Sequence, residues 1–280
     1  MYFKKAGFKR MNLQKINEFA INTILQAGRQ IRESFSKELI IETKANANDL
    51  VTNIDRKIEQ YFVEKIKELD PSHKILGEEG MGDRIATLDG PLWIIDPIDG
   101  TMNFIKQGRH FMITVGFFVD GVGKLGYLYD VMRDELISAI QGEGAFLNRQ
   151  PLKKLNPLTI EKAIIGINSS WVIPNGKINH EKLVKLIKTV RGTRSYGSAA
   201  MEIALVVTGK LDAYLSMRLA PWDIAGGLVI ANEVGAVATN LKGQPFNLLS
   251  QDTFLIANPS IHQVLLDQYI ELIEEKQHSK

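Results

Sequence analysis

The chain begins with two stretches in which apolar residues recur every three or four positions. This spacing is typical of amphipathic helices. It predicts one long helix over 13–35 and a second over 54–69. Thr52 and Asp55 have the spacing of a capping box at the start of the second helix. The segment between the two helices, Glu42–Asp49, is polar and is expected to be a loop.

The middle of the chain changes to short apolar runs separated by Gly, Asp and Asn, which favours strands. The predicted strands there are 74–76, 92–96, 111–119, 124–129 and 135–140. Past about residue 155, strands alternate with helices. The predicted strands are 163–167, 213–215 and 254–257, and the predicted helices are 181–190, 198–207, 223–234 and 261–273. This order of elements indicates stacked layers of sheets and helices.

The length and composition are those of a folded globular protein. The 280 residues are 45% hydrophobic and 24% charged, which excludes a disordered chain or a coiled coil. The length fits one large or two medium domains. We expect residues 1–10 to be a flexible basic arm, followed by an N-terminal half, 11–150, and a C-terminal half, 151–280, with a boundary near two prolines at 151 and 157.

Charge and cysteine content narrow the function classes. The chain has no Cys, which excludes disulfides, zinc–thiolate sites and thiol nucleophiles and fits a cytoplasmic location. A formal net charge of +2 does not favour a nucleic-acid partner. The longest apolar run, near 111–119, is too short to span a membrane.

The densest chemical signal is the segment Asp96-Pro97-Ile98-Asp99-Gly100-Thr101, which follows an apolar strand. Two carboxylates held close by a tight turn offer oxygen ligands for a hard cation. Thr101 is expected to open a helical turn whose free N–H groups can face an anion. Alone, an Asp-x-x-Asp turn is more often structural, with Asp99-Gly100 as ordinary turn residues.

Further acids occur in patterns that have ordinary interpretations one at a time. Glu78 and Glu79 follow a short strand, as acids in a solvated loop often do. Asp223 and Asp55 each stand near a helix start, where Asp commonly caps. The occurrence of all these segments in order in one chain favours a shared site.

Together these residues resemble the signature of the inositol monophosphatase family, which are magnesium-dependent, lithium-sensitive phosphomonoesterases. The resemblance runs from about Leu13 to Ala257, and it also includes Asp49–Asp55, Gly142–Asn148 and Gly197–Ala200. It implies an α+β / α/β fold, a layered αβαβα sandwich of the sugar-phosphatase type. It is highly specific for the superfamily and much less specific for the substrate.

The resemblance also implies a ligand set for magnesium. One ion would take Glu78, Asp96 and the backbone carbonyl of Ile98, and a second would take Asp96, Asp99 and Asp223. Two or three Mg²⁺ ions are expected, with Mn²⁺ as a possible substitute and Li⁺ as an inhibitor. Two ions in such a site clamp the phosphoryl oxygens and acidify water.

Other roles follow from the same resemblance. Thr101 would orient the attacking water, Asp55 would polarise Thr101, and Glu79 would act from the outer shell or at a third metal. Lys44 resembles a residue of a mobile loop over the site, although a solvated loop lysine is an equally good interpretation. The expected substrate contacts are Asp99, Gly100, Thr101, Gly197, Ser198, Ala199, Ser216, Arg218 and Asp223.

One departure from the family bears on the substrate. Inositol-specific members have a Glu seven residues before the Asp of a Trp-Asp motif, which is Trp222-Asp223 here. This chain has Ser216 at that position, with Arg218 nearby. A planar guanidinium favours a second anionic group. Inositol 1-phosphate is the default substrate; fructose 1,6-bisphosphate, 3′-phosphoadenosine 5′-phosphate and NADP are alternatives.

The implied partners are a small phosphorylated metabolite and a second copy of the chain, with no membrane and no nucleic acid. A different class of function is a regulatory RNA- or protein-binding module on the same fold. A third is a domain stabilised by calcium or magnesium, which would leave Thr101 and Asp55 unexplained. Because every expected metal carboxylate is present, the sequence favours the enzyme.

Overall fold

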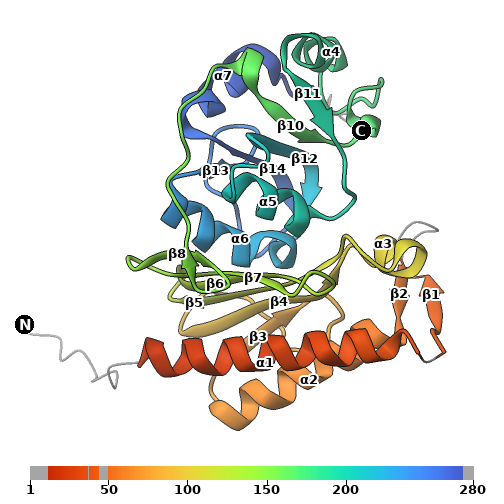
Figure 1. Ribbon diagram of the computed structural model, residues 1–280, viewed down its shortest axis with the longest axis vertical. Helices are drawn as coiled ribbons and strands as arrows, with labels where there is room; N and C mark the ends of the chain where they lie inside the picture. The colour runs from red at the N-terminus through yellow and green to blue at the C-terminus, as the bar shows by residue number, and fades with distance from the viewer. Residues whose placement is uncertain (1–11, 37, 44–49, 274–280) are drawn as a thin grey trace, which may run out of the picture.

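The protein is described by a computed structural model over residues 12–36, 38–43 and 50–273. The predicted arm over 1–10 and Lys44 lie outside these residues. Five layers are stacked in the order helices, sheet, helices, sheet, helices (Figure 1). The predicted αβαβα sandwich is therefore confirmed. No helix within the described ranges is long and apolar enough to cross a membrane.

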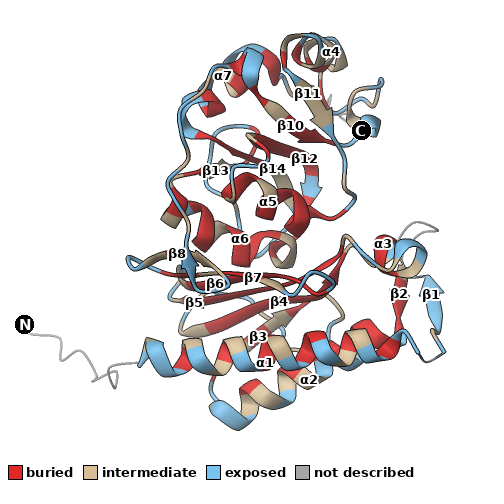
Figure 2. Ribbon diagram, in the orientation of Figure 1, coloured by how far each residue is buried: buried red, intermediate tan, exposed pale blue. Residues whose placement is uncertain are grey.

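The first layer contains α1 (Leu13–Ser34) and α2 (Asn53–Leu69). Both bury an apolar stripe and expose the opposite face, as their sequence spacing predicts (Figure 2). The capping box at the start of α2 is present. Two short antiparallel strands, β1 (Ile41–Thr43) and β2 (Leu50–Thr52), precede α2. They were not predicted, because β1 is exposed throughout and has no alternating pattern.

The second layer is a seven-stranded sheet in the order β3-β4-β5-β6-β7-β8-β9. Only β3 and β4 are parallel; the other pairs are antiparallel. The strands are β3 (Lys74–Gly77), β4 (Pro91–Asp99), β5 (Met112–Val119), β6 (Val122–Asp130), β7 (Glu135–Ile140), β8 (Gly144–Leu147) and β9 (Gln150–Pro151). A short helix, α3 (Thr101–Gln107), follows β4 as the sequence predicts.

The central helices, α5 (Ala199–Val207) and α6 (Pro221–Val234), lie between the two sheets. Paired glycines let α6 approach the large sheet very closely. A Cβ on Gly126 would lie 2.3 Å from the carbonyl oxygen of Gly226, and one on Gly226 would lie 2.5 Å from that of Tyr127. This close packing fixes the N-terminus of α6, which carries Asp223, relative to the large sheet.

The second sheet has the order β11-β10-β12-β14-β13. Its strands are β10 (Ile164–Ile167), β11 (Gly192–Arg194), β12 (Ala213–Leu219), β13 (Val237–Thr239) and β14 (Asp252–Ala257). Its outer face is covered by α4 (His180–Thr189) and α7 (Pro259–Tyr269), and single 3-10 turns occur at Ile160–Lys162 and Ser169–Trp171. The division of the chain at residue 150 stays a prediction.

Three apolar cores separate the layers, and strand alternation sorts side chains between them. In β4, Trp93 and Ile95 pack toward α1 and α2, whereas Leu92 and Ile94 pack toward α5 and α6. Trp93 is therefore a core residue between the large sheet and the first helices. Three predicted bounds are corrected. β4 continues through a bulge to Asp99, β12 continues through an irregular register to Leu219, and α7 ends at Tyr269 because Ile270 adopts extended backbone.

Candidate active site

Asp96 and Asp99 are presented by the last residues of β4. The register between β4 and β5 shifts between them, so the backbone bulges at Pro97 and Ile98. The carboxylate of Asp96 accepts the N–H of Ile98 at 2.9 Å, which fixes it over this bulge. Gly100 then takes φ 97°, a left-handed conformation that ends the strand. The residue is Gly because a side chain there would be strained and would meet Ser198 and the carbonyl of His110.

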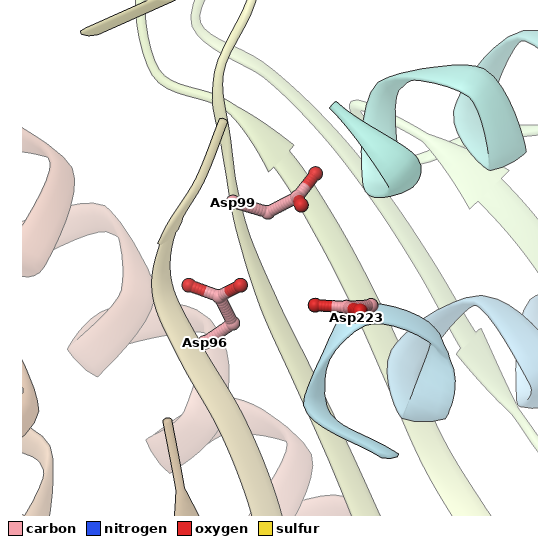
Figure 3. A group of neighbouring side chains, drawn as sticks. All are labelled: Asp96, Asp99 and Asp223. Atoms are coloured by element: carbon pink, nitrogen blue, oxygen red, sulfur yellow. The ribbon is translucent and has the colours of Figure 1, made fainter. Parts of the chain in front are cut away.

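Asp223 reaches the same place from the first turn of α6. Its carboxylate accepts the N–H of Ala220 at 2.7 Å, which ties it to the helix start. One carboxylate oxygen of each of the three Asp residues lies within 4.8 Å of the others (Figure 3). Oxygen atoms at this separation can share a small hard cation. The donor set therefore fits Mg²⁺, as the sequence predicts.

The carboxylates in this cluster repel one another. Burial and the neighbouring carboxylates of Glu78, Asp99 and Asp223 raise the pKa of Asp96 well above its ordinary range. Burial also raises the pKa of Asp99 to about 6. The pKa of Asp223 is raised by burial and by Asp99, with the guanidinium of Arg218 acting in the opposite direction. Bound cations would remove this repulsion, so the site is built to receive positive charge.

Glu78 joins the cluster from the loop after β3. Its negative charge contributes to raising the pKa of Asp55, Asp96, Asp99 and Asp223, and its side chain also hydrogen-bonds Asp96. Glu78 therefore acts electrostatically on the whole cluster, and its role as a metal ligand stays a prediction. The adjacent Glu79 is partly buried in the same loop, and its role stays a prediction.

Thr101 and Asp55 meet at the edge of the carboxylate cluster. The hydroxyl of Thr101 lies 3.2 Å from Oδ1 of Asp55 and 3.2 Å from the carbonyl oxygen of Ile98. The other oxygen of Asp55 accepts both the N–H and the hydroxyl of Thr52. These hydrogen bonds lower the pKa of Asp55, but burial has the larger effect and raises it. Asp55 is thus held rigidly with one oxygen toward Thr101.

The segment expected to contact substrate joins the site through Asp99. One oxygen of Asp99 accepts the hydroxyl of Ser198 and the N–H of Ala200, at the start of α5. Gly197 takes φ 75° just before this helix, and Ser198 caps it. This arrangement brings the predicted residues Gly197, Ser198 and Ala199 to the carboxylates.

A cavity of about 250 Å³ adjoins the carboxylates. Its lining includes Asp99, Gly197, Ser198, Ala199, Ser216 and Asp223, as well as Asn168, Trp171, Ser195, Glu202, Tyr214, Leu215 and Leu219. Arg218 is exposed and is not in this lining, although its charge acts on Asp223. The predicted substrate contact of Arg218 stays a prediction.

Several residues that hold the site together were not predicted from the sequence. Asn103 donates to the carbonyls of His110 and Tyr196, at 2.8 and 2.6 Å, and so ties α3 to the segment before Gly197. Glu202 accepts the N–H of Tyr196 at 2.7 Å and is almost fully buried. A polar residue within an apolar helix, such as Glu202 in α5, was the available signal.

Comparison with known proteins decides the family. The model of the inositol monophosphatase family matches residues 12–278. The chain belongs to the inositol monophosphatase family. It is 51% identical over 259 residues to the inositol-1-monophosphatase of Bacillus subtilis strain 168, covering 92% of this chain and 98% of that one. The predicted phosphoric monoester hydrolase is thereby confirmed.

Two solved structures of the family resemble this fold closely. A lithium chloride-soaked inhibitory complex of staphylococcal inositol monophosphatase-1 has a TM-score of 0.86 and 31% identity, covering 92% of this chain and 95% of that one. An inositol monophosphatase/NADP phosphatase complexed with Mg²⁺ and phosphate has a TM-score of 0.84 and 31% identity, covering 91% and 95%. Both agree with the layered fold described above.

Proposed function

We propose that this phosphatase is Mg²⁺-dependent and hydrolyses the monophosphate ester of a small polyol, with inositol monophosphate as its substrate. The observation that carries the proposal is the convergence of Asp96, Asp99 and Asp223 beside the Thr101–Asp55 pair. The similarity to the Bacillus enzyme supports the choice of substrate.

The residues around the proposed metal positions can be assigned roles. Asp96, Asp99, Asp223, Glu78 and the carbonyl of Ile98 would hold two or three Mg²⁺ ions, with Mn²⁺ as a substitute. When bound, such cations supply positive charge to the phosphate and acidify water. The negative charge already present in the cluster explains why a phosphate dianion would enter only a metal-loaded site.

Thr101 and Asp55 would prepare the nucleophile. A hydroxyl that donates its proton to Asp55 keeps its lone pairs for a hydrogen bond from water. Water held in this way is oriented for attack on phosphorus. Residues Gly100, Gly197, Ser198 and Ala199 would approach the phosphate and its alcohol closely, because they are small and two of them are glycines.

A second candidate is a substrate with another anionic group, such as NADP, a 3′-phosphonucleotide or a sugar bisphosphate. The observations that favour it are Ser216 in the cavity and the cation of Arg218 near Asp223. The similar structure described as an inositol monophosphatase/NADP phosphatase adds support.

The test is a phosphate-release screen with and without Mg²⁺. The panel contains inositol monophosphates, fructose 1,6-bisphosphate, 3′-phosphoadenosine 5′-phosphate and NADP. We expect Mg²⁺-dependent release, with the highest kcat/KM for inositol monophosphate. A higher kcat/KM for any doubly anionic substrate would favour the second candidate, and release that is independent of divalent cations would contradict the proposal.

The proposal also includes a homodimer in the cytoplasm. The family resemblance supports the dimer, and the absence of Cys supports a reducing compartment. Light scattering on the purified protein, and fractionation of the producing cells, test these two points directly.

A further inference from the structure

Glu59 lies beneath the loop that carries Glu78, and it is fully buried in α2, one helical turn after Asp55. One of its carboxylate oxygens accepts the N–H of Glu79 at 2.6 Å. The other accepts the N–H of Met81 at 2.7 Å. A buried acid that receives two backbone N–H groups of one loop fixes that loop, because charge-assisted hydrogen bonds are short and strong.

The backbone above Glu59 is shaped to admit this carboxylate. A Cβ on Gly77, the last residue of β3, would lie 2.4–2.6 Å from the three carboxyl atoms of Glu59. No real Cβ makes so close a contact with a carboxylate. A glycine is therefore needed at position 77 so that the carboxylate of Glu59 can approach the backbone this closely. Gly77 directly precedes Glu78 in the chain.

We infer that Glu59 is a positioning residue that sets the place of Glu78 in the metal site. The inference rests on the proposed function, since it assigns Glu78 to a bound Mg²⁺. The path is short. The carboxylate of Glu59 holds the N–H of Glu79, and this peptide bond also carries the carbonyl of Glu78. A loop held in this way presents the side chain of Glu78 to Asp96 before any metal binds.

Glu59→Gln tests the inference with little change in volume. An amide has one acceptor oxygen, so it can keep the bond to Glu79 or to Met81 but not both. The remaining N–H would face the donor amide of the glutamine. Partners that orient metal ligands commonly contribute 10- to 100-fold to metal affinity. We expect Glu59→Gln to weaken Mg²⁺ binding by about that factor, with kcat at saturating Mg²⁺ changed much less.

Two measurements that do not depend on turnover accompany the kinetics. Calorimetric titration with Mg²⁺ measures the affinity directly. Amide hydrogen exchange of the metal-free protein should show faster exchange at Glu79, at Met81 or at both in the variant. The N–H of Asp83 is an internal control, because its partner is the carbonyl of Ile75 at 2.7 Å. Its exchange should not change.

A matched control variant is Glu64→Gln, on the exposed face of the same helix. It should bind Mg²⁺ as the wild type does. If Glu59→Gln lowers the melting temperature of the metal-free protein but leaves Mg²⁺ affinity unchanged, Glu59 is only structural and the inference is wrong. A wild type that fails to bind Mg²⁺ would instead overturn the proposed function, and this inference with it.

A double-mutant cycle keeps the inference testable if Glu59→Gln folds poorly. Gly77→Ala should weaken Mg²⁺ binding in the wild-type background, because the new methyl group displaces the carboxylate. In a Glu59→Ala background no carboxylate occupies this space, so Gly77→Ala should weaken Mg²⁺ binding much less. Coupling between the two sites is the expected result. Additive effects on Mg²⁺ affinity would overturn the inference.

Discussion

The hydroxyl of Thr101 lies 3.2 Å from Oδ1 of Asp55 and so joins the first turn of α3 to the first turn of α2. Each residue is also held by its own element. Asp55 accepts two hydrogen bonds from Thr52, and the hydroxyl of Thr101 lies 3.2 Å from the carbonyl oxygen of Ile98 in the bulge of β4. The pair is thus preorganised from two segments that are far apart in the sequence.

The first prediction concerns this pair. Thr101→Ala should lower kcat by about 10²–10⁴-fold, the usual contribution of proton-handling groups. KM should change little, because the hydroxyl acts on the water and not on the substrate. Steady-state kinetics at saturating Mg²⁺ measures both constants, and Thr101→Ser, which keeps the hydroxyl, is the control. A change confined to KM would assign Thr101 to substrate binding instead.

The second prediction concerns Asp96, the more deeply buried carboxylate of the Asp96–Asp99 pair. Asp96→Asn should abolish Mg²⁺-dependent turnover, because an amide cannot neutralise cations as a carboxylate does. The metal-free variant should be more stable than the wild type at pH 8, because it no longer holds a buried carboxyl whose pKa is raised above its value in the unfolded chain. Melting temperatures with EDTA and with Mg²⁺ check this. Stabilisation by Mg²⁺ equal to that of the wild type would contradict the assignment.

How far the sequence alone could predict this site depends on the residue. Asp96 and Asp99 were predictable because an apolar strand runs directly into a tight turn, so both carboxylates must emerge together. The position of Asp223 beside these two carboxylates could not be predicted from local sequence. It depends on how closely α6 packs on the large sheet through Gly126 and Gly226. The family resemblance supplied that pairing instead.

Some residues of the site could not be predicted because their sequence pattern has a more common interpretation. Glu59 lies on the buried stripe of α2, but a single acid in an amphipathic helix is usually assigned to its solvated side. Nothing in the local sequence shows that a loop 20 residues later supplies the two N–H groups that satisfy it. Tertiary contacts of this kind can be found only once the fold brings the segments together.

The third prediction concerns lithium. If Li⁺ took the place of a Mg²⁺ ion after bond cleavage, as the family resemblance implies, inhibition would be uncompetitive or noncompetitive with respect to substrate. The similar staphylococcal structure was soaked in 100 mM LiCl as an inhibitory complex. Initial rates should be measured across substrate concentrations at limiting Mg²⁺, with NaCl as the salt control. Full activity at that lithium concentration would count against an ordinary family site.

The fourth prediction concerns the choice between substrates. Arg218→Ala should lower kcat/KM for a doubly anionic substrate roughly ten- to a hundredfold, because a charge-assisted hydrogen bond contributes about that factor. Activity on a singly phosphorylated polyol should stay nearly constant. Ser216→Glu should have the reverse effect, since a carboxylate in the cavity accepts hydrogen bonds from a polyol and repels a second anion. Equal changes for both substrates in Arg218→Ala would show that specificity lies elsewhere, such as in the Asn168–Ile178 segment.

The last prediction concerns Glu202, whose second carboxylate oxygen is buried without a hydrogen-bond partner among the described residues. Burial raises the pKa of Glu202 to about 7, with a smaller contribution from the negative charge of Asp99. The folded protein therefore holds this proton more tightly than the unfolded chain does. The resulting cost is absent below pH 4.5, grows as the pH rises to about 7, and is constant above that.

Glu202→Gln should remove that cost, because the amide oxygen can still accept the N–H of Tyr196 and the side chain cannot ionise. The full difference is about 3 kcal/mol, or a gain of about 5 °C in melting temperature, in EDTA at pH 8.5. The gain should be much smaller at pH 5. Thermal unfolding of wild type, Glu202→Gln and the exposed control Glu64→Gln at both pH values measures it. A gain of equal size at both pH values would mean that packing, and not the buried charge, accounts for the change.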